Sequence, residues 1–85
     1  MPASSVVLRI LNTAWDPIGL GSLESFDPDT DQEYAGYAQE LTSLLALGAD
    51  AARIREYLMW AEKHMGIDAS LQRIEKVTDM LLSER

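Results

Sequence analysis

The segment from Asp27 to Glu33 carries carboxylates at alternate positions, as the start of a calcium-binding EF-hand loop does. Such a loop also needs glycine at its sixth position and glutamate at its twelfth, where this chain has Gln32 and Ala38. The pattern therefore favours a solvated loop that leads into a helix, and we expect no bound metal ion.

His64 is the only histidine of the chain. A helical zinc site of the His-Glu-x-x-His kind needs a second histidine one turn away, so His64 is better explained as a charge that complements a helix C-terminus. No serine lies in a Gly-x-Ser-x-Gly turn, and Gly19-x-Gly21 lacks the Gly-Lys of a phosphate loop. These patterns predict a protein that is not an enzyme and that binds no cofactor.

The net charge of −7 belongs entirely to the first 52 residues, where eight acidic residues accompany Arg9 as the one base. Residues 53–85 hold six acidic and six basic residues. A field this one-sided attracts a basic protein and disfavours nucleic acid. We expect the partner-binding surface to be formed by the acidic residues Glu24, Asp27, Asp29 and Glu40.

Eighty-five residues, of which 47% are hydrophobic and 25% are charged, predict one globular domain over residues 1–85. The chain has no cysteine, which excludes disulfides and thiolate metal sites. Arg9 interrupts the apolar stretch near the N-terminus, and no apolar run approaches the roughly 20 residues that span a bilayer. We therefore expect neither a signal peptide nor a membrane segment, and a cytoplasmic protein.

Apolar residues at helical spacing predict an all-α fold. In the first segment, Val7, Ile10, Leu11 and Ala14 share one helical face, although Val6-Val7-Leu8 alone would also suit a strand. Pro17 ends this helix, and residues 18–29 form a loop rich in glycine, serine and acids. The expected helices cover residues 4–15, 31–47, 50–65 and 69–83.

Turn and capping residues set the expected ends of the helices. Thr30 and Glu33 fit a capping box at the start of the second helix, while Asp50 and Asp68 suit the N-caps of the third and fourth. Glycines at positions 48 and 66 end the second and third helices. Because these links are short, the last three helices should pack as antiparallel neighbours, closed by the first helix and the acidic loop. Leu44 and Leu58 are expected in their core.

The aromatic residues divide into two groups. Trp15 and the tyrosines are expected to anchor the core, with their polar atoms reaching a partner at its edge. Trp60 lies off the apolar stripe of its helix, beside Tyr57 and His64. This second stripe is either an interface or a surface that packs on the loop or the first helix.

A set of motifs resembles a group of small bacterial α-helical proteins of undescribed function. It comprises Trp15-Asp16-Pro17-Ile18-Gly19, Glu33-Tyr34 with Tyr37, a leucine-rich helix to Gly48, Tyr57-Leu58, Glu62 and Met65-Gly66. Some members of that group lie beside secreted-toxin genes, which implies an immunity role. The resemblance further implies that certain polar groups meet near the end of the first helix, as a buried hydrogen-bond network or as a shallow acidic pocket. These groups are Asp16, Glu33, Tyr34, Tyr37 and Glu62.

Two functions from different classes follow from these patterns. The first is an acidic protein that binds a basic partner, in the manner of an immunity or antitoxin-like inhibitor of a basic toxin. The second is a small structural or accessory module that homodimerises through its helical faces. The sequence leaves the oligomeric state open.

Overall fold

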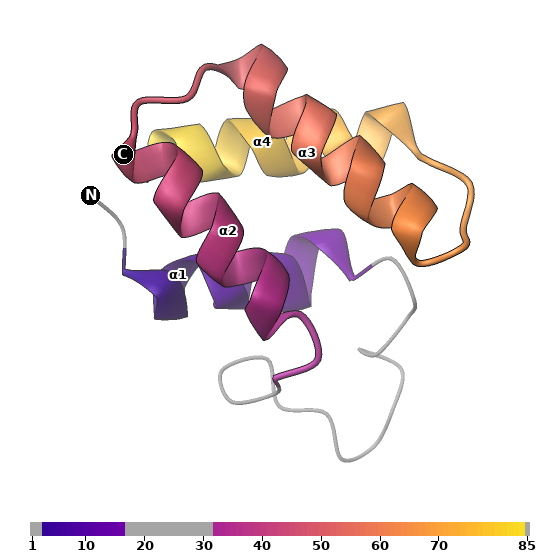
Figure 1. Ribbon diagram of the computed structural model, residues 1–85, viewed down its shortest axis with the longest axis horizontal. Helices are drawn as coiled ribbons and strands as arrows, with labels where there is room; N and C mark the ends of the chain where they lie inside the picture. The colour runs from indigo at the N-terminus through magenta and orange to yellow at the C-terminus, as the bar shows by residue number, and fades with distance from the viewer. Residues whose placement is uncertain (1–2, 17–31, 85) are drawn as a thin grey trace.

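A computed structural model describes residues 3–16 and 32–84, and its described helices surround one buried core (Figure 1). The helices are α1 (Ser4–Ile10), which continues as the π-helix η1 (Leu11–Trp15), α2 (Ala35–Ala46), α3 (Ala51–His64) and α4 (Leu71–Ser83). No strand occurs within these described ranges, so the predicted all-α class is confirmed. None of the described helices is long and apolar enough to cross a membrane.

The helices close into a ring because each contacts the next along the chain and the last returns to the first. α1 packs on α2, α2 on α3, α3 on α4, and α4 on both α1 and η1. The side chains that fill the centre are almost fully buried. They are Val7, Leu11, Trp15, Tyr34, Ala38, Leu41, Leu45, Ile54, Leu58, Ala61, Ile74, Val77 and Leu81.

The first helix buries Val7, Ile10 and Leu11 as predicted, and its last turn widens into η1. The Asp16 N–H donates to the Leu11 carbonyl at 2.8 Å, five residues back, which is the spacing of a π-helix. Asp16 then leaves the helix at φ +27°, a backbone region that aspartate tolerates better than most residues. The following proline disfavours the helical region at Asp16, so the helix ends there.

The predicted start of the second helix is wrong. α2 begins at Ala35 with Tyr34 at its N-cap position, so the helix does not start at residue 31, and the predicted cap Thr30 lies outside the described residues. The reason is the ring of Tyr34, which is fully buried in the turn before the helix. Burying a large apolar side chain contributes about 1.5–3 kcal/mol, whereas an N-cap contributes about 1 kcal/mol. The burial of Tyr34 therefore favours a turn at this position over an earlier start of the helix.

Glycine ends two helices as predicted, each through a Schellman motif. Gly48 has φ +83° and Gly66 has φ +80°, a region that a residue with a Cβ rarely adopts. The Ala49 N–H reaches the Leu44 carbonyl at 3.0 Å, and the Ile67 N–H reaches the Glu62 carbonyl at 3.3 Å. These bonds satisfy carbonyls that the helix ends would otherwise leave open.

The N-cap of α3 is Asp50, as predicted, because its carboxylate accepts from the Arg53 N–H at 2.9 Å. The predicted cap of α4 is wrong by two residues. Ser70 holds that position, and its hydroxyl accepts from the Arg73 N–H at 3.3 Å. The Ser70 N–H is itself fixed on the Glu62 carboxylate at 3.1 Å, so a contact with α3 sets where α4 begins.

Leu58 lies in the core as predicted, but Leu44 is only partly buried. The buried face of the second helix follows Tyr34, Ala38, Leu41 and Leu45, which are spaced four, three and four residues apart. Leu44 lies on the flank of that face and packs against the core from its edge, so it is only partly buried.

Candidate partner-binding site

Trp15 is the centre of a buried polar cluster that joins three helices. Its side chain is 1% exposed at the end of η1. The ring meets those of Tyr34 and Tyr37 with centroids 5.3 and 5.6 Å away, in tilted and edge-on geometry. Its indole Nε1–H donates to Glu62 Oε2 at 2.9 Å. Trp15 thus packs as a core anchor and satisfies its polar edge, as the sequence predicted.

Glu62 is fully buried on α3. Its Oε1 accepts from Arg73 Nη2 at 2.5 Å and from the Ser70 N–H at 3.1 Å. Its Oε2 accepts from Trp15 and, at 3.4 Å, from Arg73 Nε. A guanidinium that bonds both carboxylate oxygens compensates the buried charge, and the remaining donors complete its hydrogen bonding. Glu62 therefore ties η1 and the start of α4 to α3, and both oxygens are occupied by the fold.

The other predicted network residues divide between this cluster and the surface. The Tyr34 hydroxyl donates to Asp16 Oδ1 at 2.9 Å, which ties the end of η1 to the turn before α2. Tyr37 is half-buried against Trp15. Glu33 is exposed on that turn and contributes no buried group. These contacts support the buried-network alternative for Asp16, Tyr34 and Glu62 over the acidic pocket.

Sequence reasoning missed Ser70 and Arg73 in this cluster. Arg73 is one of six basic residues after position 52, and the sequence contains nothing that separates it from its solvated neighbours. Its side chain is 28% exposed, so it reaches Glu62 from the edge of the core. Only the packing of α4 against α3 identifies the pair.

A different set of aromatic rings lies on the outside of α3. Tyr57, Trp60 and His64 form this aromatic stripe, one helical turn apart. The rings of Tyr57 and Trp60 are 5.6 Å apart and tilted by 35°, while His64 stacks on Trp60 at 5.0 Å and 14°. Trp60 remains 53% exposed, which favours the interface alternative. An exposed tryptophan is a common anchor of protein interfaces.

The aromatic stripe borders a groove between α2 and α3 with a volume of about 420 Å³. We call it the α2–α3 groove, and its lining residues are Glu40, Arg53, Glu56, Tyr57 and Trp60. Arg53 Nη1 lies 3.9 Å from Glu56 Oε1, and both side chains are largely exposed. An exposed ion pair at that distance is weak, so it leaves both groups available to a partner.

Burial raises the pKa of Tyr57 to about 12, and the negative charge of Glu40 adds to this shift. The hydroxyl is therefore protonated at neutral pH and is available as a hydrogen-bond donor in the α2–α3 groove.

Of the four predicted partner-binding residues, Glu40 lies exposed on α2 and lines the α2–α3 groove. Glu24, Asp27 and Asp29 lie outside the described residues. The sequence singled out the aromatic stripe and Glu40 separately, and the fold brings them together. Arg53 and Glu56 were not anticipated there, since their spacing equally suits an ordinary pair on a solvated helix face.

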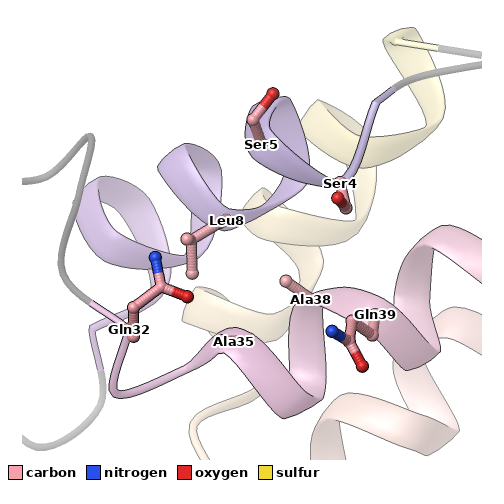
Figure 2. Close-up of a pocket in the computed structure, with 7 residues that line it drawn as sticks. All are labelled: Ser4, Ser5, Leu8, Gln32, Ala35, Ala38 and Gln39. Atoms are coloured by element: carbon pink, nitrogen blue, oxygen red, sulfur yellow. The ribbon is translucent and has the colours of Figure 1, made fainter.

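Figure 2 shows a second, smaller hollow between α1 and α2, with a volume of about 190 Å³. Its lining residues are Ser4, Ser5, Leu8, Gln32, Ala35, Ala38 and Gln39, so it carries no charged or nucleophile-activating side chain. In residues 3–16 and 32–84, no three histidine or acidic side chains are grouped so as to hold a metal ion. The α2–α3 groove is therefore the better candidate for a binding site.

No family model matches the chain, and neither a curated protein nor a solved structure matches it significantly. The resemblance to the proteins with a Trp-Asp-Pro-Ile-Gly motif stays a prediction.

Proposed function

We propose that this chain is a non-enzymatic, acidic protein that binds a basic protein partner. The observation that carries the proposal is the charge of −7 confined to the first 52 residues. Glu40, one of those acids, lies in the α2–α3 groove beside the exposed ring of Trp60. Like charges concentrated on one half of a small domain repel one another, and a cationic partner would relieve that repulsion on binding.

The partner class follows from the charge and from the resemblance. Enzymes that cleave nucleic acid have basic clefts, and an acidic protein can block such a cleft with fast, salt-sensitive association. We therefore propose an immunity or antitoxin-like inhibitor of a basic toxin, acting in the cytoplasm.

The second candidate is a module that homodimerises through its helices. It is supported by three exposed apolar side chains, because Leu47, Trp60 and Leu71 are 83%, 53% and 62% exposed. Light scattering at rising concentration separates the candidates. A monomer across the micromolar range favours the basic partner, and a tight dimer that Trp60→Ala dissociates favours the module.

The test of the proposed function is capture on the immobilised protein at low salt, followed by elution with rising salt. The proteins that the wild type captures should be basic. When the immobilised protein is a variant with Glu24, Asp27 and Asp29 changed to Lys, the same proteins should elute below physiological ionic strength. Captured proteins that are acidic, or elution that this triple charge reversal leaves unchanged, would contradict the proposal.

A further inference from the structure

We propose that the α2–α3 groove receives a cationic side chain of the partner, between the ring of Trp60 and the carboxylates of Glu40 and Glu56. This inference rests on the proposed function and names the part of the surface that would recognise the partner. It also names the chemistry of the occupant, which is a protruding arginine or lysine.

The ring of Trp60 provides the first part of such a site. A cation within about 6 Å of an indole centroid is attracted by the ring quadrupole, and tryptophan is the best of the aromatic residues in this respect. His64 stacks on Trp60 but does not line the groove, whereas Tyr57 and Trp60 both do. Trp60 stays 53% exposed although Tyr57 and His64 both lie against its ring, and this exposed part is what a cation in the groove would contact.

Carboxylates on two helices provide the second part. Glu40 comes from α2 and Glu56 from α3, and both side chains are exposed at the groove. The protonated hydroxyl of Tyr57 adds no charge there. A guanidinium suits this arrangement best, because it stacks flat on an aromatic ring and bonds carboxylates with its edge.

Arg53 shows that the groove already tolerates a cation. Its guanidinium lines the groove and lies 3.9 Å from Glu56, in an exposed and weak ion pair. A partner's cationic side chain would compete with Arg53 for the same carboxylates. Removing Arg53 should therefore tighten the binding of a cation, although it removes a polar side chain from the site.

The test uses the whole chain and a capped tri-arginine peptide, observed by ¹H–¹⁵N spectra. The two indole N–H signals form an internal comparison, since Trp60 is exposed and the Trp15 N–H is bonded to Glu62. We expect the tri-arginine peptide to move the Trp60 signal and to leave the Trp15 signal in place. Tri-glutamine and tri-leucine peptides serve as controls and should move neither.

Single substitutions then test whether Trp60, Glu40 and Arg53 each raise or lower the affinity for tri-arginine. Trp60→Ala and Glu40→Gln should each weaken tri-arginine binding about threefold or more, while Arg53→Gln should strengthen it about twofold or more. The matched controls are Leu71→Ala and Glu75→Gln, which remove an exposed apolar side chain and an exposed carboxylate on α4. They should change the affinity by less than about 1.5-fold, because neither residue lines the α2–α3 groove and an exposed charge outside it is screened by salt.

Three results would overturn the inference. If tri-leucine moves the Trp60 signal as far as tri-arginine does, the α2–α3 groove binds an apolar side chain and not a cationic one. Weaker binding by Arg53→Gln would mean that Arg53 attracts the peptide. Equal losses for Glu40→Gln and Glu75→Gln would mean that the net charge alone holds the peptide.

The captured partner separates this inference from the proposed function. If the triple reversal at positions 24, 27 and 29 lowers the affinity for the captured partner while Trp60→Ala and Glu40→Gln leave it unchanged, the partner does not use the α2–α3 groove. In that case the proposed acidic binding function stands. If no basic protein binds at low salt, the proposed function is wrong, whatever the peptide does.

Discussion

At the scale of single residues, Glu62 contributes most to the architecture. It is the one fully buried charged side chain among the described residues, and it accepts hydrogen bonds from Trp15, Ser70 and Arg73. Removing one partner of a buried ion pair leaves the other charge uncompensated, which costs about 3–5 kcal/mol. Arg73 can turn partly to water, since its side chain is 28% exposed, so we expect the lower end of that range.

Glu62→Ala should therefore lower the free energy of unfolding in urea by about 3 kcal/mol. The matched control is Glu56→Ala on the same helix, whose side chain is 79% exposed and whose ion pair with Arg53 is weak. It should cost less than about 1 kcal/mol. Equal losses for the two variants would mean that the buried cluster contributes no more than a surface pair.

Tyr57 gives a second prediction at this scale, because its pKa is raised to about 12 by burial and by Glu40. The tyrosinate absorbance of the wild type minus that of Tyr57→Phe should titrate near 12. Glu40→Gln should lower that midpoint. A difference titration centred near 10, the ordinary tyrosine pKa, would show that neither burial nor Glu40 acts on the hydroxyl.

The same shift fixes the sign of a dependence of stability on pH. The folded state holds the Tyr57 proton more tightly than the unfolded chain does. The resulting stabilisation is fully present below about pH 10 and is lost as pH rises toward 12. The free energy of unfolding of the wild type should therefore fall more steeply over that interval than that of Tyr57→Phe.

At the scale of helices, the number and type of elements could be predicted but two of their starts could not. Apolar spacing identified every helix, and Gly48, Asp50 and Gly66 marked ends that depend on local backbone chemistry. The starts of α2 and α4 depend instead on contacts between helices. Tyr34 is buried by packing around Trp15, and Ser70 is held by Glu62, and neither contact is visible in a local stretch of sequence.

The start of α4 can be tested directly. Ser70→Ala removes the hydroxyl that accepts from the Arg73 N–H and should lower stability by about 1 kcal/mol. Asp68→Ala, at the position that the sequence favoured, should change stability by less than about 0.5 kcal/mol, since Asp68 is exposed before the cap. A larger loss for Asp68→Ala, measured by thermal unfolding, would restore the sequence-based cap.

The candidate site was predictable to a similar extent. Helical spacing placed Tyr57, Trp60 and His64 on one face, and charge counting singled out Glu40. The meeting of Tyr57, Trp60 and Glu40 in the α2–α3 groove depends on how α2 crosses α3, which single-helix periodicity does not contain. The buried pair of Glu62 and Arg73 was beyond prediction for the same reason. Opposite charges on two helices look alike in sequence whether they are buried together or solvated apart.

At the scale of the whole molecule, the uneven charge is the feature that the fold does not require. The second half of the chain balances its charges, whereas the first 52 residues carry −7. Such an imbalance destabilises a compact state slightly and speeds association with an oppositely charged surface. Under the proposed function, binding of a basic partner offsets this destabilisation.

The most direct test is the association rate constant with the captured basic partner, measured by stopped flow as a function of ionic strength. Our account predicts a rate that falls about tenfold or more between low and physiological salt, because exposed charges are screened beyond about 8 Å. The triple change of Glu24, Asp27 and Asp29 to Lys should remove most of that dependence. A rate that is independent of salt and unchanged by the triple charge reversal would contradict the account.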